Sequence, residues 1–277
     1  MDYKTILVHL ERSQHESRLL DGALRLAQRF SAHLVGLHTL TPVYPPAMVP
    51  GDMVGVAQIQ EQYRRGAEQA AAALEAQFRR KAEAFPLSYE WRLAEGRTDR
   101  IVPLHARYAD LVLLGQPDPD EGFADSITDL AGVVALKAGR PVLVMPYIEN
   151  FPDRFNRVLA AWNGSREAAR ALADALPFLK AAQEVQILSI DPADAEGHLP
   201  GADIAAYLAR HGVRADARQT QSSDVDPASV LLSRAADWGA DLIVMGAYGH
   251  SRLGEMIFGG MTRMLLSSMT APVLCAH

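Results

Sequence analysis

A glycine-rich segment between residues 246 and 263 contains the residue types best suited to hold an anion. Its sequence, GAYGHSRLGEMIFGGMTR, follows the apolar run LIVM. Glycines after a buried strand let backbone N–H groups approach a phosphate closely, and a helix that begins nearby adds free N–H groups and the positive end of its dipole. The segment is not a Walker P-loop, because no Gly-Lys-Ser/Thr follows, and its glycine spacing differs from the dinucleotide fingerprint. It therefore indicates a candidate anion cradle.

The glycine-rich segment lies in the second of two similar halves of the chain. Residues 6–13 (ILVHLERS) and 158–165 (VLAAWNGS) are each an apolar run that leads into a helical pattern. Residues 109–115 (ADLVLLG) and 240–246 (ADLIVMG) are apolar runs that stop at a glycine, and each half closes on Pro-Val-Leu. Such runs are typical of buried strands, and their repetition indicates two domains of one fold.

Strands alternate with helices in both halves, which predicts a parallel sheet covered on both faces. In the first half, strands are expected near residues 4–10, 33–39, 87–93, 110–115 and 141–146, and helices near 14–30, 58–84, 98–108 and 125–138. In the second half, strands are expected near 157–162, 184–190, 213–219, 241–246 and 272–276, and helices near 165–179, 199–211, 226–238 and 254–269. We predict an α/β fold of two tandem Rossmann-like domains, residues 1–149 and 154–277, each an open five-stranded parallel sheet with helices on both faces.

The order of these features resembles the universal stress protein family, in the tandem form with two such domains in one chain. The resemblance rests on the Gly-x2-Gly-x9-Gly spacing from Gly246, on Asn-Gly-Ser after the first strand of that half and on Ala-Pro-Val-Leu at its end. It implies ATP in many members, with phosphates and ribose on backbone N–H groups of the glycine segment. It also implies adenine contacts from an acidic residue after the first strand and from the backbone at the end of the second. The closing strands of the two halves are expected to meet edge to edge.

Three glycines of this chain match those of the family, namely Gly246, Gly249 and Gly259. Gly260 stands where the family usually has Ser or Thr, so a hydroxyl donor to the phosphates is missing. Loss of one hydrogen bond to a charged group costs about 1.5–3 kcal/mol, which weakens binding without abolishing it. Thr262 matches a hydroxyl position of the family and partly compensates.

The remaining site residues of the second half follow from the same resemblance. Asn163 stands where the family usually has Asp, and its amide offers the adenine both an acceptor and a donor. Ile190 would supply backbone groups to the base, and Met261 lies within the phosphate segment. His250 and Arg252 follow Gly249 and could reach the phosphates, or they are inert loop residues. We expect ATP in this half, with Mg²⁺ accompanying it.

The first half departs from the glycine pattern. Asp118, Thr128 and Asp129 stand at the positions of Gly249, Gly259 and Gly260, with two prolines beside the first of them. A carboxylate repels a polyphosphate, and proline lacks the N–H donor. We therefore predict no nucleotide in this half.

Other polar residues have structural interpretations. Glu11 keeps the acidic position after the first strand, but without a cradle it is interpreted as a solvated turn residue. His9 and His38 lie near strand ends and have no recognisable catalytic partner. Ser13 and Ser165 are expected to cap helices, because neither lies in a Gly-x-Ser-x-Gly sequence.

Two further segments leave alternatives open. Residues 41–57, with four prolines and two glycines, are expected to form an irregular loop, either a lid, a partner surface or a tolerated insertion. A group of acidic residues is interpreted as a solvated loop, the alternative being a divalent cation site. Its members are Asp118, Asp120, Glu121 and Asp125. We predict no metal site.

Composition narrows the functional classes. The chain has 277 residues and a formal net charge of −6, so no global attraction to nucleic acid or anionic lipid is expected. No apolar stretch approaches the length of about 20 residues that a membrane span needs. The first residues, MDYKTILVHLERS, have no secretory pattern, so we expect a cytoplasmic protein. Its single cysteine, Cys275, excludes an intramolecular disulfide and is expected to be buried.

The sequence thus predicts a stress-related binding or regulatory module that responds to ATP or ADP in residues 154–277 and acts on an unknown protein partner. The two halves would form a pseudo-dimer within one chain, and further dimerisation is open. No general base is paired with a nucleophile, so we predict no catalytic residue, although slow ATP hydrolysis is conceivable. The alternatives are a nucleotide-free interaction scaffold and a nucleotide phosphohydrolase or nucleotidyl transferase.

Overall fold

The computed structural model describes residues 2–42, 53–121, 130–148, 151–152, 154–192, 201–248 and 260–277. The first half contains strands β1 (Thr5–His9), β2 (His33–Leu40), β3 (Tyr89–Glu95), β4 (Leu111–Gly115) and β5 (Val142–Met145). Its helices are α1 (Glu16–Phe30), α2 (Met53–Ala82), α3 (Thr98–Ala106) and α5 (Leu130–Ala138), with a short 3₁₀ helix at Pro119–Glu121.

The second half repeats this order. Its strands are β6 (Arg157–Ala161), β7 (Glu184–Ile190), β8 (Asp216–Thr220), β9 (Leu242–Gly246) and β10 (Val273–Ala276). Its helices are α6 (Arg166–Asp174), α7 (Leu176–Leu179), α8 (Ala202–Arg210), α9 (Pro227–Trp238) and α10 (Gly260–Ser268). The predicted alternation of strands and helices is therefore confirmed in both halves.

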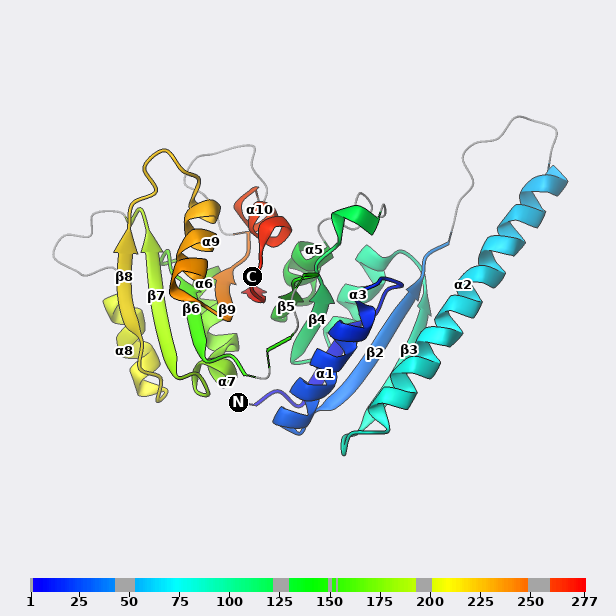
Figure 1. Cartoon of the computed structure of the whole chain (residues 1–277), viewed down its shortest axis with the longest axis horizontal. Coiled ribbons are helices and arrows are strands. Elements are labelled where there is room, and N and C mark those ends of the chain that lie inside the picture. The colour runs from blue at the N-terminus through cyan, green and yellow to red at the C-terminus, as the bar shows by residue number, and fades with distance from the viewer. Residues whose placement is uncertain are drawn as a thin grey trace.

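All ten strands form one sheet in the order β3-β2-β1-β4-β5-β10-β9-β6-β7-β8. Neighbouring strands are parallel within each half, whereas β5 and β10 pair antiparallel, with Leu143 opposite Leu274. In Figure 1 these two strands lie in the middle of the molecule, and β3 and β8 lie at its ends. The expected edge-to-edge contact of the closing strands is confirmed, so the two halves share a continuous sheet.

Successive side chains of each strand point to opposite faces of the sheet, and helices cover both faces. Ile6 and Val8 of β1 pack in one buried cluster, and Leu7 between them packs in another, as the two-residue period of a strand requires. The first cluster contains the apolar sides of α1, α2, α6, α7 and α8, and the second those of α3, α5, α9 and α10. Both clusters run through both halves, and Cys275 is buried in the second.

Local structure differs from the expectation in three places. Helix α2 begins at Met53, so the last part of the expected loop at residues 41–57 is helical, and residues 43–52 lie outside the described ranges. The helix expected over residues 165–179 is divided into α6 and α7. Pro177 in the first turn of α7 has no N–H to continue the hydrogen bonds of α6. Strand β8 begins at Asp216, later than residue 213.

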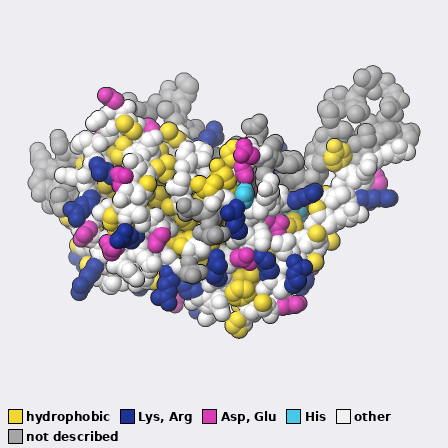
Figure 2. Space-filling view, in the orientation of Figure 1, with side chains coloured by type: hydrophobic (Ala, Val, Ile, Leu, Met, Phe, Trp, Pro, Cys, Tyr) yellow, Lys and Arg dark blue, Asp and Glu magenta, His cyan; other side chains and the backbone are white. Residues whose placement is uncertain are grey.

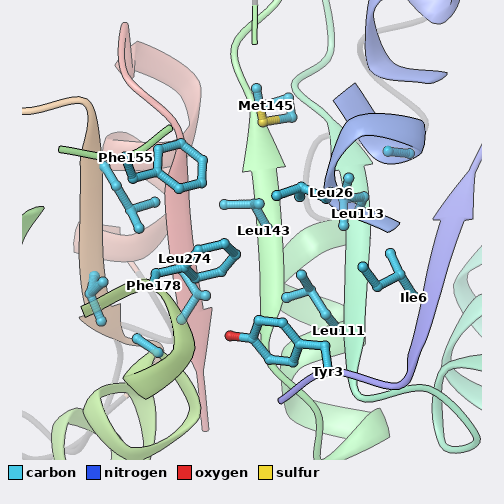
Figure 3. Close-up of a cluster of buried hydrophobic side chains, with 14 of the residues drawn as sticks. Tyr3, Ile6, Leu26, Leu111, Leu113, Leu143, Met145, Phe155, Phe178 and Leu274 are labelled. Atoms are coloured by element: carbon cyan, nitrogen blue, oxygen red, sulfur yellow. The ribbon is translucent and has the colours of Figure 1, made fainter. Parts of the chain in front are cut away.

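Aromatic side chains join the halves on one face of the sheet. The ring of Phe178 in α7 lies 5.4 Å from that of Tyr3, 5.5 Å from that of Phe30 and 5.1 Å from that of Phe155. The Tyr3 hydroxyl also donates to the backbone oxygen of Asp174 at 2.6 Å. Figure 3 shows Tyr3, Phe155 and Phe178 around the β5–β10 contact. The two halves therefore share a core.

Surface charge and helix length are the features relevant to binding of nucleic acid or membranes. Figure 2 shows basic and acidic side chains interspersed over the described part of one face. Among the described residues, no helix combines the length and apolar character needed to cross a membrane.

Candidate functional site

The site predicted in the second half lies at the carboxyl ends of three adjacent strands. Asn163 follows β6, Ile190 ends β7 and Gly246 ends β9, and β6 pairs with both of the others. This is the point at which strand order reverses, where open parallel sheets place their ligands. Helix α10 begins at Gly260, after the glycine segment. Of the remaining predicted residues, Gly249, His250, Arg252 and Gly259 lie outside the described ranges.

Gly246 is needed for close packing of the chain. A Cβ atom at this position would lie 2.6 Å from the backbone nitrogen of Ala168 and 2.7 Å from the carbonyl carbon of Glu167. Both atoms belong to the first turn of α6, so the space that glycine leaves is filled by that helix. The structure thus gives Gly246 a packing role that the sequence motif did not reveal.

Asn163 and Ser165 organise the start of α6. The Asn163 side-chain oxygen accepts from the backbone nitrogen of Ser165 at 3.1 Å, in a turn in which Gly164 has φ +74°. The Ser165 hydroxyl accepts from the backbone nitrogen of Ala168 at 3.1 Å, which confirms the predicted helix cap. The prediction for Ser13 is wrong, because α1 begins after His15 as its N-cap. The Asn163 carbonyl is therefore already engaged by the protein, while its side chain stays exposed.

Helix α10 is attached to the end of β9 through Thr262. This side chain is buried, and its hydroxyl oxygen accepts from the backbone nitrogen of Tyr248 at 3.3 Å. Tyr248 has φ +57°, in the left-handed region that few residues other than glycine adopt. The Thr262 hydroxyl keeps a proton to donate, and Met261 beside it is 41% exposed. The start of α10 is thus held beside the end of β9 by a buried hydroxyl.

A cavity of about 1030 Å³ opens in the first half, at the carboxyl ends of β1, β4 and β5. It lies at the corresponding reversal of strand order, because β1 pairs with both β2 and β4. The first turn of α1 and Thr98 at the start of α3 form part of the wall. Leu266 and Ser267 of α10, from the other half, form another part.

Gln116 attaches the last turn of α10 to this cavity. Its side-chain nitrogen donates to the backbone oxygens of Leu266 at 2.9 Å and Ser267 at 3.1 Å, and its side-chain oxygen accepts from the backbone nitrogen of Tyr147 at 3.3 Å. Gln116 is buried, and these hydrogen bonds satisfy its amide group. Because 150 positions separate Gln116 from Leu266, no local pattern could have identified this link. In the sequence, this link corresponds to a polar residue, Gln116, at the position that Ala247 occupies in the second half.

Two histidines form part of the polar wall of the cavity. His9 is buried, and its Nε2 lies 3.2 Å from the Thr39 hydroxyl, which in turn lies 2.8 Å from the hydroxyl of Thr98. Burial, reinforced by His38, lowers the pKa of His9 to about 3, so this imidazole is neutral near pH 7. His38 donates from Nδ1 to the Leu10 carbonyl at 2.7 Å, and burial lowers its pKa too. These contacts agree with the structural interpretation of both histidines.

Glu11 faces the same cavity, which corrects its interpretation as a solvated turn residue. Its side chain is 40% exposed, yet it lines the cavity rather than the outer surface. Burial by the surrounding protein raises the pKa of Glu11 to about 7. Its carboxylate oxygen lies 3.6 Å from Nδ1 of His9, which is uncharged. A half-ionised carboxyl group therefore faces the cavity at neutral pH.

The acidic segment after β4 is also partly organised. Asp118 Oδ2 accepts from His15 Nε2 at 2.7 Å, and its Oδ1 accepts from the backbone nitrogen of Asp120 at 2.9 Å. The hydrogen bond from His15 lowers the pKa of Asp118. Arg18 contacts His15 and donates to the Tyr147 carbonyl at 2.7 Å. Asp118 is thus held in a polar cluster rather than solvated, and the described residues contain no group of three potential metal ligands. Asp125 lies outside the described ranges.

The raised pKa of Glu11 predicts a pH-dependent effect of Glu11→Gln. The wild-type carboxyl ionises near pH 7 in the folded chain, against 4.5 when freely exposed, so the folded state binds more protons between these values. Wild-type stability should therefore fall relative to the variant as pH rises from 5 to 8. Urea unfolding at both pH values measures the difference. The exposed Glu83 supplies the control Glu83→Gln, for which no such divergence is expected; an equal result for both variants would contradict the prediction.

Comparisons with known proteins agree with the sequence repeat and with the fold. The model of the Universal stress protein family matches residues 2–146 and again residues 154–277. A universal stress protein from Archaeoglobus fulgidus DSM 4304 superposes with a TM-score of 0.67 at 16% identity, covering 99% of this chain and 96% of that one. A putative universal stress protein from Pseudomonas aeruginosa UCBPP-PA14 gives 0.60 at 15% identity, covering 99% and 93%.

A search of curated proteins finds no significant match. The likenesses to solved structures, at these identities, show the fold, whereas the family model identifies the sequence itself. Its two matches together extend over most of the chain and fall one in each half of the structural repeat. The chain therefore belongs to the universal stress protein family, in the tandem form with two such domains.

Proposed function

We propose that this chain is a nucleotide-responsive binding and regulatory module, with one site for ATP or ADP in residues 154–277. The observation that supports it is the convergence of the ends of β6, β7 and β9 on the glycine segment that leads into α10. Backbone N–H groups in the first turn of a helix suit phosphate, and Gly260 adds no side chain at that position in α10. Thr262 keeps a hydroxyl proton to donate. Bound nucleotide supplies negative charge at this helix end, and Mg²⁺ accompanies ATP.

The first half is proposed to bind no nucleotide. The carboxylate of Asp118 faces the cavity there, and Pro117 and Pro119 on either side of it have no N–H to offer a phosphate. The proposed stoichiometry is therefore one nucleotide per chain. In this proposal the occupied site alters an exposed surface that a protein partner reads, and the partner is a second protein or another copy of this chain.

Calorimetric titration of nucleotide-stripped protein with ATP, with and without Mg²⁺, tests this proposal. We expect one site per chain in the wild type and loss of binding in Gly249→Asp, which places at the cradle the carboxylate that the first half has at Asp118. Gly66→Asp is the matched control, because Gly66 is exposed on α2 and no atom lies within 4 Å of an added Cβ. This variant should bind ATP as the wild type does.

Other outcomes identify the alternatives. Unchanged binding in Gly249→Asp would place the site elsewhere. Absence of heat and of a thermal shift at millimolar ATP would overturn nucleotide binding and leave an interaction scaffold, with residues 41–57 as the next surface to test. Phosphate release at catalytic rates that depends on His250 would favour a phosphohydrolase.

A further inference from the structure

We propose that the cavity of the first half binds a small organic cation, a protonated amine on an aromatic or apolar body, with the carboxylate of Glu11 as its counter-ion. This site is separate from the proposed nucleotide site of the second half. It rests on the cavity, on an acidic group that has no cationic partner, and on the apolar and aromatic side chains around it.

Glu11 carries a charge for which the described residues supply no charged partner. Among the described residues, its ionic contact is with His9, and that imidazole is neutral because it is buried. Arg12 follows in the chain, but its side chain is exposed and forms no ion pair with Glu11 in the described structure. His38, from the neighbouring strand, is also held towards its neutral form. The surrounding protein disfavours the ionised form of this carboxyl group, and a bound ammonium group would offset that cost.

Of the other charged side chains that line the cavity, Asp118 and Arg18 have hydrogen-bond partners among the described residues, whereas one carboxylate oxygen of Glu16 is buried without one. Asp118 accepts from His15, and Arg18 contacts His15 and donates to the Tyr147 carbonyl. Glu16 lies in the field of Lys81, which lowers its pKa against the larger effect of burial. The wall therefore contains three acidic side chains, those of Glu11, Glu16 and Asp118. Two guanidinium groups also line it, of which Arg18 is engaged by His15 and the Tyr147 carbonyl and Arg12 is exposed. A ligand cation is attracted to the Glu11 end of the cavity.

The rest of the wall suits an apolar body. Aliphatic side chains from two strands and three helices line it, and two aromatic residues, Tyr147 and Phe151, lie beside them. The aliphatic members are Leu19, Leu114, Leu130, Val144, Met145 and Leu266. The volume of about 1030 Å³ can accept a bicyclic ring system. Aromatic rings prefer edge or offset contact with other rings, which favours an alkylamine that carries an aromatic ring.

Three matched probes test the proposal on the full chain by calorimetry. Tryptamine carries an ammonium group, tryptophol replaces it by a neutral hydroxyl, and indole-3-propionate carries a carboxylate. At pH 8 we expect tryptamine to bind about tenfold more tightly than tryptophol, because the ammonium group forms an ion pair with the carboxylate and the neutral hydroxyl does not. Indole-3-propionate should bind most weakly. Since Glu11 ionises near pH 7, the tryptamine affinity should rise about tenfold between pH 6 and pH 8.

The variant Glu11→Gln tests whether this carboxylate causes the preference for tryptamine. The variant keeps the shape of the side chain and should lower tryptamine affinity about tenfold at pH 8, to the level of tryptophol, whose own affinity stays unchanged. Glu83→Gln makes the same charge change on an exposed residue and should leave all three affinities as in the wild type. Unfolding midpoints of both variants show that they are folded.

Three results would overturn the proposal. They are equal binding of tryptamine and tryptophol by the wild type, tighter binding of indole-3-propionate than of tryptamine, and unchanged tryptamine affinity in folded Glu11→Gln. None of these depends on ATP, so failure here is distinguishable from failure of the nucleotide site.

Discussion

Replacement of Phe178 by alanine is expected to lower the free energy of unfolding by about 3–5 kcal/mol. Phe178 is fully buried, and its ring contacts the rings of Tyr3, Phe30 and Phe155. Two of these three belong to the first half and Phe178 belongs to the second, so the cavity left by alanine would lie between the halves (Figure 3). The side chains around this cavity are attached to both halves of one sheet and can fill it only partly. The expected loss of unfolding free energy therefore lies in the upper part of that range.

Urea unfolding followed by far-UV circular dichroism measures this loss. The control is Tyr108→Ala, which removes an aromatic ring that is 78% exposed and should change stability by less than about 0.5 kcal/mol. A second transition in Phe178→Ala, with the halves unfolding separately, would agree with a weakened shared core. A loss below about 1 kcal/mol would show that the halves do not depend on this cluster.

Gly246→Ala adds only one methyl group, yet it is expected to lower the free energy of unfolding by about 1–3 kcal/mol. The added Cβ would lie 2.6 Å from Ala168 N and 2.7 Å from the Glu167 carbonyl carbon. These are backbone atoms of α6, which cannot rotate away as a side chain can. The end of β9 must therefore separate from the start of α6. Because Asn163 and the glycine segment adjoin this contact, nucleotide affinity should fall as well if the proposed site is correct.

Gly115→Ala supplies an internal control for this experiment. Gly115 ends β4 as Gly246 ends β9, but a Cβ there would meet only Leu19 Cδ2, at an ordinary 3.6 Å. Neither glycine has a positive φ, so backbone conformation does not distinguish the two positions. Gly115→Ala should leave stability unchanged or raise it by a few tenths of a kcal/mol. Equal unfolding midpoints for the two variants would contradict the packing role of Gly246.

The sequence predicted the fold because its evidence is local and repeated. Residues 111–114 and 242–245 are apolar throughout, as is typical of strands buried on both faces, and the glycine after each run is the observed strand end. The Ser165 cap depends on the next few residues alone, and it is confirmed. Edge-to-edge contact of β5 with β10 is an expectation from the family resemblance, since nothing in either strand specifies its partner, and the structure adds that the two strands run antiparallel.

The candidate sites were less accessible to sequence reasoning, because burial depends on residues far apart in the chain. Glu11 was interpreted as solvated from its immediate neighbours, whereas the wall around it also includes Gln116 and Leu266. Burial raises the pKa of Glu11, and burial arises only once the fold brings segments distant in the chain together. Gly246 was identified as a motif glycine, but its contact with α6 depends on helix packing.

By itself, then, the sequence determined the alternation of strands and helices, the duplication and the place of the glycine segment, since hydrophobic period and glycine spacing act over a few residues. Only the tertiary structure decided that the halves share one core, that β5 and β10 run antiparallel, and that a cavity lined by Glu11 lies in the half without the glycine motif. Those features arise where β1, β4, β5 and the end of α10 meet, and the environment of a side chain there is set by packing across the whole chain.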